Sequence, residues 1–273
     1  MGFERPWLAN YPKGIGPEVD LEKYASIVSV LEETCRLYRD NPAFANFGKK
    51  LTYAEVDELS TRFANYLLHD LKLKKGDRVA LMMPNILQYP IAIFGVLRAG
   101  LTVVNTNPMY TARELRHQLT DSGASAIVVL ENFAHVVEEV AADTPLKQVI
   151  VTGVGDMLGF PKGTLVNFVL RHVKKQVPEY RLPGHVRFTD TLARGAGKTL
   201  PAIELRGEDI AFLQYTGGTT GVAKGAMLTH RNLVANMQQS SVWLGSNAKP
   251  GHEVIITALP LYHIFALTAN CLV

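Results

Sequence analysis

Short apolar segments alternate with longer amphipathic ones between residues 78 and 152, and this alternation constrains the fold more than any other feature of the sequence. The apolar segments are five to seven residues long, which suits buried strands better than helices. We predict these strands at residues 78–83, 101–105, 124–130 and 148–152. Strands that alternate with helices favour βαβ units and a mainly parallel sheet. We therefore predict an α/β fold with helices that flank the sheet.

Local signals place the helices before and between these strands. Residues 27–39 carry apolar side chains at helical spacing, and Pro42 ends this segment. A threonine followed three residues later by glutamate forms a capping box, which marks the start of a helix. Two such pairs occur, Thr52 with Glu55 and Thr111 with Glu114. Further helices are predicted at residues 86–98 and 133–140.

Length and composition indicate a globular protein without disulfide or cysteine–metal crosslinks. A chain of 273 residues buries enough surface to fold without them, and 47% hydrophobic with 19% charged residues excludes an intrinsically disordered chain. The formal net charge of +3 is too small to indicate nucleic-acid binding, which requires a clustered basic face. Only two cysteines occur, Cys35 and Cys271, with no CxxC motif. We therefore expect a protein of the reducing cytoplasm with no nucleic-acid partner.

The segment 255–273 contains no Asp, Glu, Lys or Arg, which raises the question of a membrane span. Pro260, His263 and Asn270 interrupt it, and its β-branched run gives way to a different pattern. A buried strand followed by a buried helix explains these features better than a spanning helix. The segment ends within an apolar run, so we expect the chain to be part of a longer protein.

Shifts in composition divide the chain into four parts. Residues 1–25 are rich in Pro, Gly and Tyr and are expected to form an irregular arm. Residues 26–182 hold the alternating pattern and form a predicted first α/β subdomain. Residues 183–207 are richer in Gly, Arg and Thr and are predicted as a connection at the surface. Residues 208–273 then begin a second subdomain.

The most informative segment begins where an apolar strand, residues 209–215, runs into a glycine-rich sequence. Residues 216–226 hold four glycines, three threonines and one lysine, and a helix with a cap near Thr229 is predicted to follow. Glycines let backbone N–H groups approach an anion, hydroxyls add donors and lysine adds a positive charge, so the segment suits a polyphosphate. It is not a Walker A loop, because Ala223 precedes Lys224 where that motif requires glycine. A flexible hairpin loop remains an open alternative.

The sequence YTGGTTGVAKGA at residues 215–226, followed by MLTHRN, resembles the AMP-binding signature of the acyl-adenylate-forming superfamily. Within that superfamily, the chain resembles the bacterial long-chain fatty-acyl-CoA synthetases. The resemblance extends to residues 74–85, 97–100, 105–110, 121–125 and 259–267 and so covers nearly the whole chain. Ala223 stands where the superfamily usually has proline, as in the long-chain bacterial subgroup. The resemblance implies that the α/β fold is part of the large N-terminal domain of an adenylate-forming enzyme.

The resemblance further implies a ligase reaction in two steps. The carboxylate of a long-chain fatty acid attacks the α-phosphorus of ATP to give acyl-AMP and pyrophosphate, and coenzyme A then displaces AMP to form acyl-CoA. The implied nucleotide contacts are Tyr215, Thr216, Gly217, Gly218, Thr219, Thr220, Gly221, Val222, Ala223, Lys224, Gly225 and Ala226. Thr216 is the expected Mg²⁺ ligand, and His263 is the expected catalytic residue beside the α-phosphate and the acyl carboxylate. A core histidine without a catalytic role is the alternative for His263.

Neighbouring residues leave further interpretations open. Tyr262, Phe265 and Leu267 either line the path of the acyl chain or belong to a packed core. His230 starts the helix after the glycine-rich segment, where capping and surface solvation are expected and direct contact with ATP is the alternative. The remaining histidines, His117 among them, show no metal-ligand spacing and are expected to have ordinary roles.

Residues 163–180 form a predicted basic amphipathic helix. Its apolar stripe consists of Leu165, Phe168, Val169, Val173 and Val177, and its polar side carries Arg171, Lys174 and Lys175. Such a helix can lie on an anionic membrane, which suits an enzyme with a lipid substrate. A surface helix that packs its stripe on the core is the alternative. We therefore expect a cytoplasmic location. The alternative is a cytoplasmic protein with peripheral contact at the inner membrane through residues 163–180.

The later motifs of the resembled family have no match in this chain. These motifs are the Tyr-Gly-x-Thr-Glu segment, the ribose-binding aspartate, the hinge and the C-terminal domain with its catalytic lysine. We therefore expect the N-terminal half of the large domain, inactive by itself, with an exposed core face that favours a homodimer. Two other interpretations stay open. One is an enzyme that adenylates aryl or amino acids, and the other is a non-catalytic interaction module with a vestigial phosphate loop.

Overall fold

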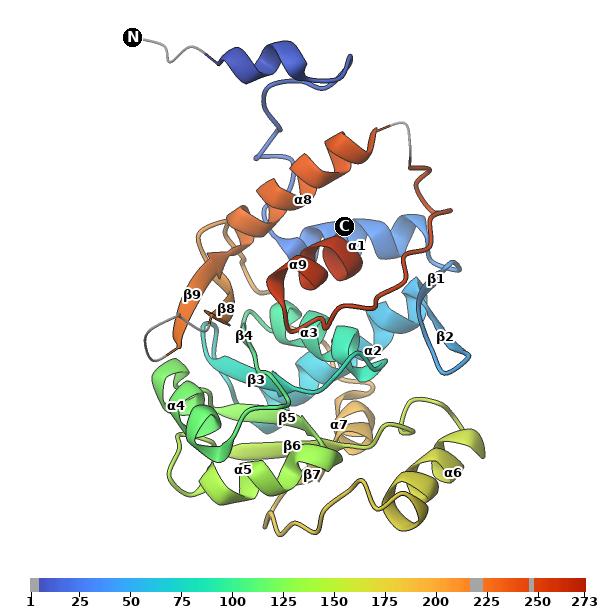
Figure 1. Cartoon of the computed structure of the whole chain (residues 1–273), viewed down its shortest axis with the longest axis vertical. Coiled ribbons are helices and arrows are strands. Elements are labelled where there is room, and N and C mark those ends of the chain that lie inside the picture. The colour runs from blue at the N-terminus through green and yellow to red at the C-terminus, as the bar shows by residue number, and fades with distance from the viewer. Residues whose placement is uncertain (1–4, 217–222, 246–247) are drawn as a thin grey trace.

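A computed structural model describes residues 5–216, 223–245 and 248–273. These residues form a seven-stranded sheet with the strand order β7-β6-β5-β3-β4-β8-β9 (Figure 1). The strands are β3 (Arg78–Met82), β4 (Thr102–Asn105), β5 (Ala126–Leu130), β6 (Gln148–Thr152), β7 (Val186–Arg187), β8 (Ile210–Thr216) and β9 (Lys224–Thr229). Neighbouring strands are parallel except for β8 and β9, which are antiparallel. The prediction of an α/β fold with a mainly parallel sheet is confirmed.

Helices and turns surround this sheet (Figure 1). The α-helices are α1 (Ile27–Leu37), α2 (Tyr53–Asn65), α3 (Gln88–Arg98), α4 (Ala112–Ser122), α5 (Ala134–Ala141), α6 (Lys162–Phe168), α7 (Phe188–Gly195), α8 (His230–Leu244) and α9 (Ile264–Leu267). Short 3₁₀ and π-helical turns are η1 (Pro6–Asn10), η2 (Tyr66–Asp70), η3 (Glu131–Phe133), η4 (Val169–Val173) and η6 (Thr268–Leu272). A separate hairpin consists of β1 (Pro42–Asn46) and β2 (Lys49–Thr52).

Two hydrophobic cores lie on opposite faces of the sheet. Val79 and Leu81 of β3 belong to the core that includes side chains from α1, α2, α3 and α7. Ala80 and Met82, the alternate residues of the same strand, belong to the core that includes α4 and α5. This division follows from the two-residue period of a strand. The central strands are therefore buried on both faces, which explains why they are apolar throughout.

Capping boxes start α2, α4 and α8. The Thr52 backbone N–H donates to Glu55 Oε2 at 2.8 Å, and the Glu55 N–H donates to Thr52 Oγ1 at 3.2 Å, as predicted. The box predicted at Thr111 is present at the start of α4. Thr229 begins α8 in the same way with Asn232 as its partner, which confirms the predicted cap. Each cap contributes about 1 kcal/mol to stability.

Helix α3 is buried along its whole length, and α2 packs directly against it. A Cβ on Gly95 would lie 2.7 Å from Phe63 Cδ1, so the two helices need glycine at this contact. Arg98 at the end of α3 is buried, and its guanidinium pairs with Asp57 and, at 3.4 Å, with Glu32. Pairing offsets the desolvation of this charge. These contacts fix α3 on the sheet.

Residues 183–207 depart from the predicted surface connection. They contribute β7 to the edge of the sheet and α7 to the core, where Phe188 is fully buried. Composition missed these elements because Gly and Arg surround a short helix whose apolar side chains pack against α2. The division into subdomains 26–182 and 208–273 stays a prediction, and β8 shares the sheet of the earlier strands.

The segment after α8 is exposed and not buried. Val254 and Ile256 are 90% and 87% exposed, and residues 254–257 lie in neither strand nor helix. The predicted buried strand is therefore wrong, because no strand of the described residues pairs with this segment and no layer covers it. The helix predicted after it is present as α9 and η6, with Leu267 fully buried. None of the helices in the described ranges is long and apolar enough to cross a membrane.

Candidate functional site

The glycine-rich segment starts at the carboxyl end of β8 and returns along β9. Because β8 is parallel to β4, its end lies at the edge of the sheet where β3, β4 and β5 also end. Ligands of open α/β sheets bind outside this edge. Gly217, Gly218, Thr219, Thr220, Gly221 and Val222, six of the predicted nucleotide contacts, lie outside the described residues. The others lie on the two strands and just before β9.

Thr216 and Lys224 are directly opposite each other in the β8–β9 pair, and both are exposed. Opposite residues of an antiparallel pair project to the same face, with Cβ atoms about 4.5–5.5 Å apart. The hairpin therefore places one hydroxyl and one ammonium group side by side at the start and end of the glycine-rich segment. This pair could bind an anion. The strand β9 was not predicted, so Lys224, Gly225 and Ala226 are strand residues and not part of a loop.

Tyr215 and Gly225 form the next pair along the hairpin. A Cβ on Gly225 would lie 3.0 Å from ring atoms Cε2 and Cζ of Tyr215, so glycine leaves room for the ring. The Tyr215 hydroxyl donates to Asp121 Oδ2 at 2.6 Å. Burial raises the pKa of Tyr215, and the hydrogen bond to Asp121 raises it further. The phenol therefore stays a protonated donor, and its ring is fixed where the glycine-rich segment begins.

His117 holds the other end of this segment. Its Nε2 donates to the backbone carbonyl of Ala223 at 2.9 Å. His117 and Asp121 are four residues apart on α4, and so they project from one face of that helix. Helix α4 thus ties down both ends of the glycine-rich segment. The sequence contained a signal for this arrangement, namely the i, i+4 spacing after the predicted capping box, but His117 was expected to be ordinary.

His263 lies at the N-terminus of α9 with an exposed side chain. Its ring centroid is 4.8 Å from that of Tyr262. The Tyr262 backbone carbonyl accepts a hydrogen bond from Gln214 Nε2 at 2.8 Å, and Gln214 precedes Thr216 by two residues in β8. The fold therefore brings the backbone next to His263 to the strand that carries Thr216. The exposed side chain is at odds with the alternative of a core histidine.

The residues around His263 divide between core and surface. Leu267 is fully buried and belongs to the core. Tyr262 is half-buried and packs against the same core. Phe265 is 69% exposed. Of the three residues predicted to line an acyl path or pack in the core, Phe265 alone is available on the surface.

His230 is buried, although surface solvation was expected for it. The Ile27 backbone N–H donates to His230 Nδ1 at 3.3 Å, which joins the start of α8 to α1. Burial lowers the pKa of His230 to about 4, although Asp209 acts in the opposite direction. His230 is therefore neutral at pH 7 and serves the fold, whereas the adjacent Arg231 remains exposed.

A metal ion has few protein ligands in this part of the molecule. Within the described ranges, no group of three His, Cys, Asp or Glu side chains is close enough to hold one. Mg²⁺ takes oxygen ligands and is commonly held by one or two protein groups together with substrate phosphates. The exposed hydroxyl of Thr216 fits that limited role. It does not by itself make a metal site.

The matched region in known proteins includes the hairpin described above. The family model for AMP-binding enzymes matches residues 31–273. The chain belongs to the AMP-binding enzyme family. The long-chain-fatty-acid–CoA ligase of Escherichia coli O157:H7 is 54% identical over 270 residues, which cover 99% of this chain and 48% of that relative. The ligase of the same description from Bacillus subtilis strain 168 is 36% identical over 272 residues, which cover 98% and 48%.

A solved structure shares the fold of this chain. The crystal structure of a long-chain-fatty-acid-CoA ligase from Archaeoglobus fulgidus matches with a TM-score of 0.70 and 24% identity, over 94% of this chain and 46% of that one. At this identity the likeness shows the fold alone. The chain spans about half the length of the curated relatives it matches, and it corresponds to their N-terminal half, as predicted.

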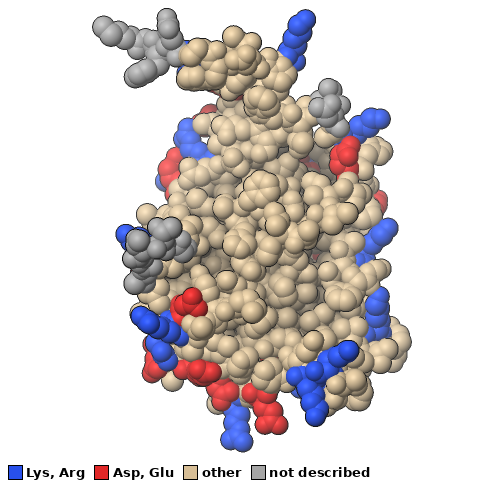
Figure 2. Space-filling model, viewed as in Figure 1, with Lys and Arg blue, Asp and Glu red and all other residues tan. Residues whose placement is uncertain are grey.

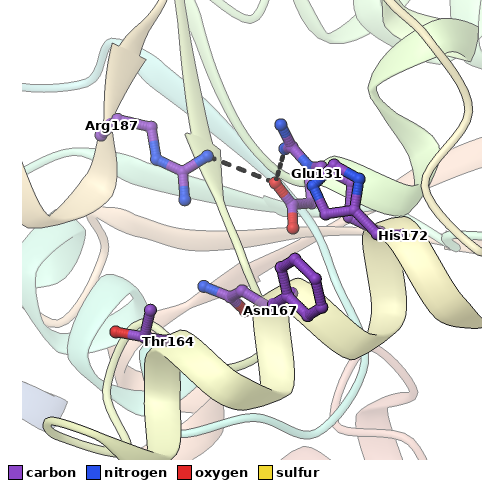
Figure 3. A pocket seen from close by; sticks show the side chains of 7 residues that line it. Glu131, Thr164, Asn167, His172 and Arg187 are labelled. Atoms are coloured by element: carbon purple, nitrogen blue, oxygen red, sulfur yellow. Dashed lines mark hydrogen bonds and ion pairs between the residues drawn. The ribbon is translucent and has the colours of Figure 1, made fainter.

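A second feature of this chain is the ionic contact that holds α6 and η4 (Figure 3). The carboxylate of Glu131 is buried and pairs with Arg171 of η4 and, at 3.3 Å, with Arg187. Arg187 also donates to both oxygens of Asp156, at 3.1 and 3.0 Å. Glu131, Arg171, Arg187 and Asn167 line a cavity of about 340 Å³. The two carboxylates neutralise both arginines, so the network offers no free positive charge to an anion. It connects η4 to β7 of the sheet.

The apolar side chains on the outer side of α6 and η4 do not pack on the core. Leu165, Phe168 and Val173 are 63%, 55% and 63% exposed. The predicted helix also ends earlier, at Val173, so that Val177 follows it in irregular structure. The alternative in which the stripe packs on the core is therefore wrong for these three side chains.

Proposed function

We propose that this chain is the N-terminal part of an ATP-dependent long-chain fatty-acid–CoA ligase. The reaction would join a fatty acid to ATP with release of pyrophosphate and then transfer the acyl group from AMP to coenzyme A. The observation that carries this proposal is the β8–β9 hairpin, which presents Thr216 and Lys224 together at the carboxyl edge of the sheet. The fatty substrate is inferred from relatives described as long-chain-fatty-acid–CoA ligases.

The proposed chemistry requires positioning and neutralisation of charge. A carboxylate is a weak nucleophile and ATP carries several negative charges, so fixed donors and cations lower the barrier most. Lys224 would balance charge on the β- and γ-phosphates, and the hydroxyl of Thr216 would bind phosphate or Mg²⁺. When bound, Mg²⁺ neutralises phosphate charge. Tyr215, held by Asp121, would keep these groups in place.

His263 is the proposed catalytic residue. Its exposed ring leaves Nδ1 and Nε2 free of hydrogen-bond partners among the described residues. We place this ring beside the α-phosphate and the attacking carboxylate, where a ring N–H would donate to a phosphate oxygen and stabilise the charge that develops there.

An exchange assay tests both the activity and the substrate class. The full-length protein, with whatever follows Val273, is incubated with labelled pyrophosphate, MgATP and one acid at a time. Hexadecanoate should support exchange at least about tenfold faster than benzoate or an amino acid. Faster exchange with an aromatic or amino acid would replace the fatty substrate. The absence of exchange and of MgATP binding would favour an interaction module. The chain by itself is expected to give no acyl-CoA.

We also propose that the exposed stripe of α6 and η4 rests on an anionic bilayer. Leu165, Phe168 and Val173 would insert, each with at most about 1.5–3 kcal/mol from burial, and each adjacent Lys would add about 1 kcal/mol. The Glu131 network would hold the inner side of the helix during this contact. A cytoplasmic location at the inner membrane accords with unpaired cysteines and with ATP and coenzyme A as substrates.

Co-sedimentation with vesicles containing phosphatidylglycerol tests the membrane contact. Lys174→Glu/Lys175→Glu should lower the partition coefficient at least about 30-fold, because loss of two attractive charges costs about 2 kcal/mol and the new charges are repulsive. Lys72→Glu/Lys74→Glu is the matched control, since these exposed lysines lie at the opposite edge of the sheet, before β3. Equal binding of the first variant and the wild type would refute the contact.

A broad uncharged face suggests self-association of the 273-residue chain. Figure 2 shows that Lys, Arg, Asp and Glu lie mainly around the rim of this face, which α9 and residues 248–263 occupy in Figure 1. Exposed apolar side chains of these segments include Val254, Ile256 and Phe265. A contiguous apolar surface of this kind favours association. Light scattering at increasing concentration should show a homodimer, and a monomer throughout would refute it.

A further inference from the structure

Three buried side chains form one continuous line of hydrogen bonds from α3 to the residue before His263. The Tyr89 hydroxyl donates to Asn105 Oδ1 at 2.9 Å, and Asn105 Nδ2 donates to Gln214 Oε1 at 3.0 Å. Gln214 Nε2 then donates to the Tyr262 carbonyl at 2.8 Å. Tyr89, Asn105 and Gln214 are 0%, 3% and 6% exposed. The line thus crosses from a fully buried helix to an irregular segment at the surface.

Both amide side chains of this line have a hydrogen-bond partner on each side. Each amide accepts a hydrogen bond on its oxygen and donates one from its nitrogen. A flip of either amide group would exchange these two atoms and break two hydrogen bonds. The Asn105 backbone carbonyl accepts from Gln118 Nε2 at 2.9 Å, which fixes the middle of the line to α4. Buried polar groups that are fully paired hold a single arrangement, because any break leaves an unpaired group in a low-dielectric interior.

The position of His263 depends on its backbone. Asn85 holds the segment before it, since Asn85 Oδ1 accepts from Leu261 N at 2.8 Å and Nδ2 donates to Leu259 O at 2.9 Å. Gln214 adds a side-chain hydrogen bond to the adjacent Tyr262, and the His263 N–H itself donates to the Pro260 carbonyl at 3.0 Å. The imidazole makes no hydrogen bond to the described residues, so these backbone contacts and the neighbouring Tyr262 ring are what locate it.

The same strand also locates Thr216. Residues two apart in a strand project to one face, so Gln214 and Thr216 lie on the same side of β8, and Lys224 is opposite Thr216 on that side. Gln214 therefore sets the separation between the His263 segment and the start of the glycine-rich segment.

We infer that Tyr89, Asn105 and Gln214 are positioning residues. They fix the position of His263 relative to the nucleotide held at Thr216 and Lys224. This inference rests on the proposed function. A displacement of about 1 Å in such a group lowers the rate of a reaction about 100-fold without removing a contact to substrate. A break in this line of hydrogen bonds should therefore lower kcat for acyl-AMP formation and leave the KM for ATP nearly unchanged.

A double-mutant cycle in the full-length protein tests this role. Gln214→Glu keeps the size of the side chain and its acceptor for Asn105, but it replaces the donor to Tyr262 with a carboxylate oxygen. It should lower kcat for fatty-acid-dependent pyrophosphate exchange about 10–100-fold, with the KM for ATP within about twofold. In a His263→Ala background the same substitution should lower kcat by less than about twofold. Gln148→Glu, in β6, is the matched control and should leave kcat unchanged.

Other outcomes separate the possible failures. A loss at Gln214→Glu that adds fully to that of His263→Ala indicates a general structural role and overturns the inference, as does a full rate in His263→Ala. If the wild type lacks exchange, the ligase proposal fails, and the imidazole NMR signals of His263 decide the positioning claim. These signals should shift in Gln214→Glu and stay unchanged in Gln148→Glu, and equal spectra overturn the claim. Tyr89→Phe, which keeps the bond to Tyr262, replaces Gln214→Glu if that variant does not fold.

Discussion

Stability below neutral pH should depend on His230. The imidazole is buried between α1 and α8, and its Nδ1 accepts the N–H of Ile27. Burial lowers the pKa of His230 from 6.5 to about 4, with Asp209 raising it and Lys75 lowering it to smaller extents. The unfolded chain therefore binds a proton near pH 6.5, and the folded chain binds it only near pH 4. Stability is fully present above pH 6.5 and falls as the pH drops through this window.

The magnitude follows from the two pKa values. At about 1.4 kcal/mol for each pH unit, the interval from 6.5 to about 4 corresponds to about 3 kcal/mol of unfolding free energy. A protonated ring would also lose the lone pair that accepts the Ile27 N–H. This amount is a large part of the 5–15 kcal/mol that is typical of domains.

Urea unfolding of the wild type and of His230→Gln measures this contribution. Glutamine carries no titrating group, so the difference in unfolding free energy between the two proteins isolates the histidine, while other pH effects cancel. The difference should be constant above pH 6.5 and should change by about 3 kcal/mol, to the disadvantage of the wild type, between pH 6.5 and pH 4. A difference that stays the same over this range would refute the assignment of a neutral, buried His230.

Two further substitutions test the hairpin and the helix that follows it. Gly225→Ala places a methyl group 3.0 Å from the Tyr215 ring and should lower the unfolding free energy by about 1–3 kcal/mol, whereas Gly16→Ala, in open surroundings, should have little effect. Thr229→Ala removes the acceptor for Asn232 N–H at the start of α8 and should cost about 1 kcal/mol, measured by urea unfolding against Ser241→Ala as control.

Sequence patterns predicted the elements whose causes are local. The strands β3 to β6 were found because both faces of each are buried, which makes the apolar run continuous. The boxes at Thr52 and Thr111 were found because the capping partners are three residues apart. The resemblance to AMP-binding enzymes was carried by contiguous motifs, chiefly residues 215–226, and the family match confirms it.

The elements that were missed depend on partners distant in sequence. Strand β9 pairs with β8 across the glycine-rich segment, and nothing in its own mixture of Lys, Gly and Met requires a strand. Residues 254–257 are β-branched, but a strand also requires a neighbour, and the described residues supply none. His117 and His230 acquire their roles from Ala223 and Ile27, each more than one hundred residues away. Spacing within one segment cannot reveal such contacts.

The central claim is that Thr216 and Lys224 hold the phosphates of a nucleotide. Calorimetric titration of the full-length protein with MgATP, repeated on Lys224→Ala, tests it most directly. Loss of a charged hydrogen bond to phosphate is worth about 1.5–3 kcal/mol, so the affinity for MgATP should fall about 10–100-fold. Lys74→Ala, an exposed lysine on a turn before β3, should bind as the wild type does. Equal affinity of Lys224→Ala and the wild type would contradict the claim.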